Sequence, residues 1–356
     1  MSLTVNNEIN RGDCVEMNTG DQKLKTGDQR GGAPLHVRNP LWLAPLAGVT
    51  LPPVRRFFSR LGAGLTHTEM ISCMGITHGN RKTAGMLRIL EGEGPVVLQL
   101  FAPDVSSLVG GAGTALRISS EINAVQFAAL GINMACPMPK VTKRGAGAAL
   151  MNAPDTAFEM TRGLKKLGLP VWIKTRRGEG ERPESLSRTL RFVEGLVNAG
   201  ADNVCVHGRT PAQRYEGRAD KEIVGEAAAK FPGKISASGD VYAPEDVLDY
   251  IGMGCVGVML ARGAVANPFL FRKSLLALGF PVSRECDDTF NERIGILLKL
   301  SEELKAECGD RLAVVLLKRF LGGVLRGFPM SAEARRAVGV VTDFYEMTRV
   351  LRSFAG

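Results

Sequence analysis

Cys136 is the residue of this chain best placed to do chemistry. It follows the apolar run Val125–Ile132, which predicts a buried strand, and Pro137 and Pro139 come directly after it. Proline neither donates to a β-ladder nor continues a helix comfortably, so the thiol is expected on a stiff loop where the strand ends. Barrel enzymes place their chemistry at this end of their strands. We therefore predict a catalytic role for Cys136.

Polar or turn-forming residues stand at the ends of the other apolar runs as well. A barrel of parallel strands would bring these positions into one ring, although they lie far apart in the sequence. Each position alone is a weak signal, and their convergence is the stronger one. The candidate binding residues at these ends are Pro45, Leu46, Ala47, Gln99, Asn133, Lys174, His207, Ser238, Gly239, Asp240, Ala261 and Arg262.

Three of these residues have an alternative interpretation. Lys174 lies in the apolar run Val171–Lys174, and a buried lysine is costly without an anion or electron-rich partner. We expect it to face a cofactor ring or a phosphate, the alternative being an ammonium that reaches solvent at the strand end. The amide of Gln99 needs partners, which are a ligand or the backbone. His207 is either a ligand contact or a core histidine.

The loops after the last two predicted strands favour a phosphate site. Gly239 and Gly263 would let backbone N–H groups approach a bound group closely, and each is placed near a helix start. These two loops are a common phosphate site in barrels, and Arg262 would add a forked positive charge. The alternative is a pair of ordinary strand-to-helix turns.

The chain alternates strand and helix patterns eight times from residue 41 onward. Short, continuously apolar runs bounded by Gly or Pro are typical of parallel strands buried on both faces. Helical patterns such as Pro53–Leu61, Ala157–Leu167 and Leu186–Ala199 separate them. The pattern predicts a (β/α)8 TIM barrel, with strands at Leu41–Pro45, Leu65–Met70, Val96–Phe101, Gln126–Asn133, Val171–Arg176, Asn203–His207, Lys234–Ser238 and Val256–Leu260.

After the barrel the strand pattern stops. Arg293–Cys308, Ala313–Gly327 and Ala332–Phe354 show helical periodicity with no strand between them. The α/β barrel is therefore predicted to be followed by a small C-terminal all-helical domain. We place a flexible leader at residues 1–39, the barrel at residues 40–280 and the helical domain at residues 281–356.

Composition narrows the classes of protein. The net charge is +9, and the segment 311–336 carries six basic residues against one acidic residue. This basic segment suits binding of a polyanion such as nucleic acid, and the alternative is an ordinary solvated helix face. No apolar run is long enough to span a membrane, and no secretory signal is visible. Seven cysteines without a CxxC pair favour reduced thiols in a cytoplasm, and four scattered histidines predict no metal site.

The motifs together resemble the tRNA-dihydrouridine synthases (Dus), which are FMN-dependent barrels with a C-terminal helical RNA-binding domain. The occurrence of all these motifs in the same order over about residues 40–350 is specific for the family, although no single motif is specific. The matching stretches are Ala44–Thr50, Thr68–Met70, Ile132–Val141, Lys143–Gly147, Ile173–Arg176, His207–Thr210, Gly239–Val241, Arg262–Ala264 and Asn267–Pro268.

The resemblance implies an activity. Specific uridines in tRNA would be reduced to 5,6-dihydrouridine, with hydride from reduced FMN going to C6, a proton from Cys136 going to C5, and NADPH as reductant. FMN would contact Pro45, Leu46 and Ala47, with Gln99, Lys174 and His207 around its ring and ribityl chain and with Ser238, Gly239, Asp240, Ala261 and Arg262 at its phosphate. The tRNA would be bound by Asn133, Lys140, Lys143, Arg144, Arg176, Arg209, Lys318, Arg319 and Arg326.

Three positions depart from the family pattern. Ala135 stands where a glycine usually precedes the cysteine, Ser238 where asparagine is common, and Ala261 where glycine is common. Alanine disfavours the positive φ that glycine permits, so Ala135 bears most directly on the Cys136 loop. Two other functions remain open: an FMN barrel acting on a free pyrimidine, as dihydroorotate dehydrogenases do, and a catalytically silent RNA-binding barrel. The sequence does not predict the oligomeric state or the uridine position.

Overall fold

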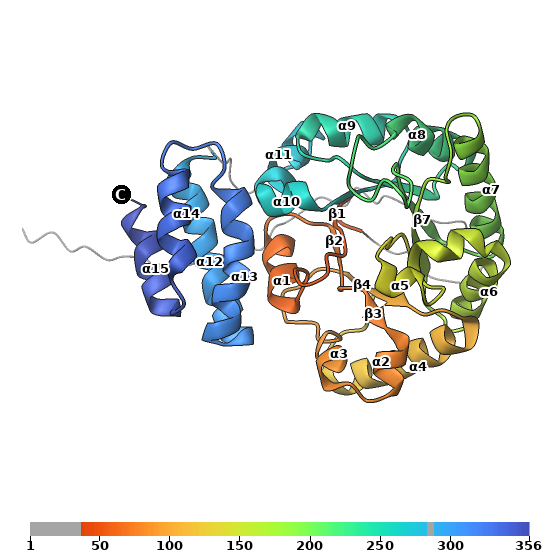
Figure 1. The fold of residues 1–356 in the computed structure, drawn as a ribbon, viewed down its shortest axis with the longest axis horizontal. Coiled ribbons are helices and arrows are strands. Elements are labelled where there is room, and N and C mark those ends of the chain that lie inside the picture. The colour runs from red at the N-terminus through yellow and green to blue at the C-terminus, as the bar shows by residue number, and fades with distance from the viewer. Residues whose placement is uncertain (1–36, 283–287, 356) are drawn as a thin grey trace, which may run out of the picture.

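The structure is a computed structural model, and it describes residues 37–282 and 288–355. The predicted leader, residues 1–39, lies outside the described residues except for its last three positions. Within the described chain, nine parallel strand segments form one closed sheet, and helices surround it (Figure 1).

The sheet is the predicted eight-stranded parallel barrel. It closes because β1 pairs with both β2 and β9, and β2 also pairs with β4. The strands are buried along almost their whole length, as expected where helices cover the outer face. Their bounds are β1 Leu41–Leu43, β2 Leu65–His67, β3 Ile71–Ser72, β4 Val96–Phe101, β5 Ala129–Met134, β6 Val171–Arg176, β7 Asn203–His207, β8 Ile235–Ser238 and β9 Val258–Leu260.

The second predicted strand is divided into β2 and β3, and both segments pair with β4. The interruption falls at Thr68, whose hydroxyl accepts a hydrogen bond from the backbone N–H of Gln99 at 2.9 Å. A side-chain oxygen therefore takes the place of a backbone carbonyl in the ladder at this point. The chain then bends before Ile71, and this bend places Glu69 and Met70 at the carboxyl end of the barrel.

Helices form the outer ring, and several of them begin at a recognisable cap or proline. The carboxylates of Asp104 and Asp220 accept hydrogen bonds from the first turns of α4 and α8, and proline opens α5, α6 and α9. The bounds are α1 Pro52–Arg60, α2 Cys73–Thr77, α3 Arg81–Gly85, α4 Val105–Ile122, α5 Pro139–Thr142, the 3-10 helix η1 Gly147–Asn152, α6 Pro154–Lys165, α7 Glu184–Asn198, α8 Lys221–Lys230, α9 Pro244–Gly252, α10 Arg262–Ala266 and α11 Leu270–Ala277.

Four helices follow the barrel: α12 Phe290–Cys308, α13 Asp310–Val324, α14 Ser331–Val340 and α15 Phe344–Ser353. They stand to one side of the barrel, next to α1 and α10 (Figure 1). The helical pattern Ala332–Phe354 is divided into α14 and α15, because the carboxylate of Asp343 caps a new helix by accepting from the N–H of Glu346 at 2.8 Å.

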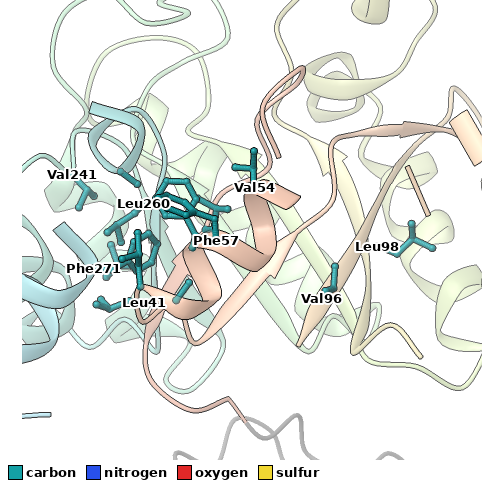
Figure 2. Close-up of a cluster of buried hydrophobic side chains, with 14 of the residues drawn as sticks. Leu41, Val54, Phe57, Val96, Leu98, Val241, Leu260 and Phe271 are labelled. Atoms are coloured by element: carbon teal, nitrogen blue, oxygen red, sulfur yellow. The ribbon is translucent and has the colours of Figure 1, made fainter. Parts of the chain in front are cut away.

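One hydrophobic core joins the barrel to these helices. Figure 2 shows its part around α1 and α11, where Leu41, Phe57, Leu260 and Phe271 meet. The core continues into α12–α15 without interruption among the described residues. Ion pairs of Arg56, Arg60 and Arg88 with glutamates of α12 reinforce this contact at its rim. The predicted boundary at residue 281 remains a prediction.

The inside of the barrel is filled by side chains below its carboxyl end. Trp42 and Trp172 lie with their ring centroids 4.7 Å apart, and the ring of His67 lies 6.1 Å from that of Trp172. Together with Met259 above them they close the interior, so the barrel is a packed core and not a channel. Any ligand must therefore bind above this layer.

His67 is expected to make stability fall in acid. Burial lowers the pKa of His67 from 6.5 to about 4, and its Nδ1 lies 2.8 Å from the Leu43 carbonyl oxygen. Between these two pH values the unfolded chain binds a proton that the folded chain does not. The folded state therefore loses about 1.4 kcal/mol per pH unit as the pH falls from 6.5 toward 4. Urea unfolding at pH 7, 6 and 5 should show a shallower loss for His67→Gln, and an equal loss in both proteins would contradict this account.

Arg55 and Glu93 form a fully buried ion pair between α1 and the segment before β4. Arg55 Nε lies 2.8 Å from Glu93 Oε2, and its other nitrogens donate to the carbonyls of Thr50 and Arg88. Burial raises the pKa of Glu93, and the charge of Arg55 opposes that rise. Each charge of the pair is balanced by the other. Removing one partner would therefore leave the other charge buried without a counter-charge.

Arg55→Met should lower the free energy of unfolding by about 3–5 kcal/mol, because it leaves the Glu93 carboxylate buried without its cation. Urea denaturation followed by far-UV circular dichroism measures the change. Arg60→Met on the same helix is the control. The Arg60 side chain is 58% exposed and pairs with Glu303, so its loss should cost about 1 kcal/mol or less. Equal effects of the two substitutions would contradict this account.

Candidate active site

A cavity of about 350 Å³ opens at the carboxyl ends of the barrel strands, a size within the usual range for ligand sites. All eleven residues predicted to bind the cofactor line it. So do Cys136 and three of the predicted substrate contacts. The predicted lining residues are Pro45, Leu46, Ala47, Gln99, Asn133, Cys136, Lys140, Lys174, Arg176, His207, Ser238, Gly239, Asp240, Ala261 and Arg262.

A chain of side-chain hydrogen bonds holds the Cys136 loop. Asn133 Nδ2 donates to Gln99 Oε1 at 3.0 Å, and Asn133 Oδ1 accepts from the backbone N–H groups of Ala135 and Cys136 at 3.2 and 2.9 Å. The amide of Asn133 therefore fixes its own orientation and the start of the loop together. Its place at the end of β5 makes it a positioning residue for the thiol.

The far side of the loop is held by η1. The N–H of Ala148 donates to the Cys136 carbonyl at 3.0 Å. Gly147 has a φ of +63°, and a Cβ on it would stand 2.7 Å from that carbonyl oxygen. Only glycine allows the backbone to approach so closely in this conformation. The Cys136 main chain is thus fixed from both sides, and its half-buried side chain lines the cavity.

Ala135 fits this loop without strain. The described non-glycine residues with positive φ are Arg214, Asp240 and Asp288, so Ala135 keeps an ordinary negative φ. Its carbonyl accepts a hydrogen bond from Arg176 Nε at 2.8 Å. The departure from the family's glycine therefore does not distort the backbone before the thiol.

Arg176 ties three backbone segments together. Besides Ala135, its guanidinium donates to the carbonyls of Thr210 and Arg214 at 3.0 and 2.8 Å. Burial lowers the pKa of Arg176. The side chain lines the cavity but is only 2% exposed, so it connects the Cys136 loop to the loop after β7.

The Lys174 ammonium points into the cavity without a partner. Asn133 and Lys174 are register partners on β5 and β6, so both side chains lie on the inner face of the barrel. Among the described residues no hydrogen bond or ion pair reaches the Lys174 ammonium, whose pKa is lowered by burial. An unpaired cation at this depth favours an anionic or electron-rich ligand.

His207 is a neutral imidazole at the cavity wall. Burial lowers the pKa of His207, and the charges of Lys174, Arg176, Arg209 and Arg262 lower it further. Its ring packs against Gly239, where a Cβ would stand 2.7 Å from the ring. A neutral imidazole there can exchange hydrogen bonds with a ligand while adding no charge.

Arg209 does not reach the substrate side, contrary to the sequence expectation. Its guanidinium is 3% exposed and donates to the carbonyls of Glu216 and Gly217 and to Asp240 Oδ2, the last at 2.7 Å. All of its donors face the protein, because the loop after β7 folds back over it. Asp240 in turn has a φ of +49°, so the ion pair holds a conformation that aspartate rarely adopts.

The sequence missed two aromatic side chains at the rim of the cavity. Tyr215 and Tyr242 are 58% and 50% exposed, and the Arg262 guanidinium lies 5.0 and 5.8 Å from their ring centroids. Both rings line the cavity. Both tyrosines come from loops, where the sequence has no periodic pattern that would indicate their positions. The sequence feature that could have identified them is that the chain has only four tyrosines, and two of these lie close in sequence to predicted site residues.

The remaining predicted tRNA contacts lie outside the cavity. Lys143 and Arg144 are exposed just after α5. Lys318 donates to the Gly339 carbonyl at 2.8 Å, and exposed Arg319 donates to the Gly48 carbonyl in the loop after β1. Arg326, after the end of α13, is exposed. These side chains do not converge on the thiol. Arg319 brings α13 to the loop after β1, whose residues 45–47 line the cavity.

Among residues 37–282 and 288–355, no group of three or more His, Cys, Asp or Glu side chains is arranged to hold a metal ion. In the same residues no helix has both the length and the apolar character needed to cross a bilayer.

These features define a (β/α)8-barrel enzyme whose site lies at the carboxyl ends of the strands. The family model described as dihydrouridine synthase (Dus) matches residues 42–353, and the chain belongs to this family. A probable tRNA-dihydrouridine synthase of Treponema pallidum is 33% identical over 71% of this chain and 76% of the relative. The tRNA-dihydrouridine synthase B of Pasteurella multocida is 28% identical over 89% and 93% of the two chains.

A comparison of structures finds the same barrel in a distant protein. The old yellow enzyme of Trypanosoma cruzi aligns with a TM-score of 0.54 at 12% identity, covering 74% of this chain and 93% of that structure. At this identity the likeness concerns the fold.

Proposed function

We propose that this protein reduces specific uridines of tRNA to 5,6-dihydrouridine, with FMN as cofactor and NADPH as reductant. The observation that carries the proposal is the shared cavity: the Cys136 thiol, the unpaired Lys174 ammonium and every residue expected around FMN line it together. The family membership and the names of the relatives support the same conclusion.

The residues present fit a flavin. The unpartnered ammonium of Lys174 suits the electron-rich edge of the ring, with Gln99 and neutral His207 beside it. Residues 45–47 would lie against the ring from the loop after β1. At the other end of the cavity, Ser238, Gly239, Asp240, Ala261 and Arg262 would hold the phosphate, with Arg209 positioning Asp240 from behind.

Bound FMN would supply hydride for C6 of the uracil. A proton must then be delivered to C5, and the Cys136 thiol, which its loop holds at the cavity wall, would donate it. Asn133 and Arg176 keep the thiol in place, because both hold the backbone of residues 135 and 136. A rigid loop matters here, since a small displacement of the donor lowers the rate of proton transfer sharply.

Basic residues at the cavity rim and beyond it would hold the tRNA backbone. Contacts with the phosphates supply most of the affinity of a protein for a nucleic acid and fix its position. Such contacts are needed here because the target base must leave its stack to enter a buried site. The residues proposed for these contacts are Lys140, Lys143, Arg144, Lys318, Arg319 and Arg326.

The proposal is tested by nucleoside mass spectrometry of tRNA from cells that lack the gene. We expect dihydrouridine to disappear at one or more defined positions and to return when the intact gene is restored. Unchanged dihydrouridine at every position, in a strain without a second gene of this family, would contradict the proposal. A purified protein without flavin absorbance would favour the catalytically silent alternative.

A further inference from the structure

A second, larger cavity of about 860 Å³ lies beside the catalytic cavity. Pro137 lines both cavities. In the loop after β7, Arg214 and Glu216 line the second cavity, while Tyr215 between them lines the first. The same two loops therefore contribute to both cavities, which places the cavities next to each other.

The wall formed by α6 and α7 offers an aromatic surface. The rings of Phe158 and Phe192 lie with their centroids 5.9 Å apart. Phe158 packs directly over Gly195, where a Cβ would stand 2.0 Å from the ring, so the helix packing fixes its position. Phe192 is almost fully buried and Phe158 half-buried, which leaves the Phe158 ring accessible to a planar apolar group.

The rim of this cavity carries three exposed arginines and two glutamates. Arg188 pairs with Glu184 at 2.5 Å and Arg191 with the Ser187 hydroxyl at 2.8 Å. Both are exposed contacts within one helix, which contribute little and exchange easily for a stronger partner. The lining charged residues are Glu179, Arg188, Arg191, Arg214 and Glu216.

The carboxylates at the rim compete only in part with an incoming anion for the arginine side chains. Glu179 Oε1 already accepts a hydrogen bond from the Ala212 N–H at 3.0 Å. The side chain of Arg214 has no partner among the described residues. The site thus combines an aromatic surface with arginine forks, which suits a nucleotide that carries phosphates.

We propose that the second cavity binds the adenosine end of the nicotinamide dinucleotide, with Arg188 and Arg191 on its phosphates and the base against Phe158. The inference rests on the proposed function, which brings the nicotinamide to the adjacent catalytic cavity. The basic residues of α13 stand on the opposite side of the barrel from α6 and α7 (Figure 1). The other proposed tRNA contacts, Lys140, Lys143 and Arg144, are not among the residues that line the second cavity. A tRNA held by both sets of residues leaves the Phe158 wall free, which favours the dinucleotide over RNA as occupant.

Calorimetric titration of the flavin-loaded, full-length protein with 2′,5′-ADP tests the site. This probe carries the adenosine end alone and cannot reach the flavin. We expect the double variant Arg188→Ala/Arg191→Ala to weaken its binding about tenfold or more, because two charge-assisted hydrogen bonds are lost. Arg117→Ala is the matched control, since Arg117 is also an exposed arginine paired with a glutamate four residues away, on α4 outside both cavities.

Stopped-flow reduction of the bound flavin gives a second readout. The double variant should raise the apparent Kd for NADPH by a similar factor, with the limiting rate of flavin reduction and the KM for tRNA unchanged. Unchanged 2′,5′-ADP binding would overturn the inference, and a raised KM for tRNA with unchanged 2′,5′-ADP binding would assign the cavity to RNA. Failure of NADPH to reduce the wild-type flavin would instead overturn the reductant in the proposed function.

Discussion

Cys136→Ala should lower the rate of dihydrouridine formation in tRNA by about 10²–10⁴-fold, the usual range for losing a general acid. The reduction of bound flavin by NADPH should stay unchanged, because the methyl group keeps the loop and removes only the proposed proton donor. The backbone N–H and carbonyl of residue 136 still bond to Asn133 Oδ1 and the Ala148 N–H. The two half-reactions are separated by anaerobic stopped-flow absorbance.

Two further substitutions make this test specific. Cys308→Ala removes a half-buried thiol at the end of α12, far along the chain from the cavity, and should leave both half-reactions unchanged. Cys136→Ser keeps a weak O–H donor and should retain more tRNA reduction than the alanine variant. Full tRNA reduction by Cys136→Ala would remove the thiol from the mechanism.

Lys174→Met is expected to have opposite effects on the flavin-free and the flavin-loaded protein. In the flavin-free protein the substitution removes a partly buried ammonium that has no partner among the described residues, so the free energy of unfolding should rise by about 1–3 kcal/mol. In the loaded protein it would remove the charged hydrogen-bond donor that we propose for the ring. FMN affinity should therefore fall about 10- to 100-fold.

Fluorescence titration with FMN and urea unfolding of the flavin-free protein measure these two effects. Lys140→Met, at an exposed position of the same cavity, is the control and should change neither value much. A Lys174→Met protein that binds FMN as tightly as the wild type would contradict the assignment of Lys174 to the cofactor.

The barrel could be predicted because its strands are continuously apolar and punctuated by glycine and proline. Several of the polar positions that interrupt this pattern, Gln99, Asn133 and Lys174 among them, line the cavity. A polar residue in a buried strand needs a ligand or a partner. The division of the second strand escaped prediction because it depends on the Thr68 hydroxyl meeting the backbone of Gln99 across the sheet.

The burial of individual arginine side chains could not be predicted from the residue type and its position in the sequence. Arg209 and Arg262 both follow a strand end, yet Arg209 is enclosed by the carbonyls of residues 216 and 217 while Arg262 lies exposed between Tyr215 and Tyr242. The difference comes from how the loop after β7 folds back. The second cavity was missed for a related reason, because α6, α7 and η1 form it only after they pack together.

A single-turnover reaction with the purified, flavin-loaded protein tests the central claim most directly. The flavin is reduced by NADPH without oxygen, the excess reductant is removed, and unmodified tRNA is added. We predict that the flavin is reoxidised at the same rate as dihydrouridine appears in the tRNA, with one uridine reduced per flavin. A flavin that stays reduced in the presence of tRNA, or that is reoxidised without any dihydrouridine, would contradict the account.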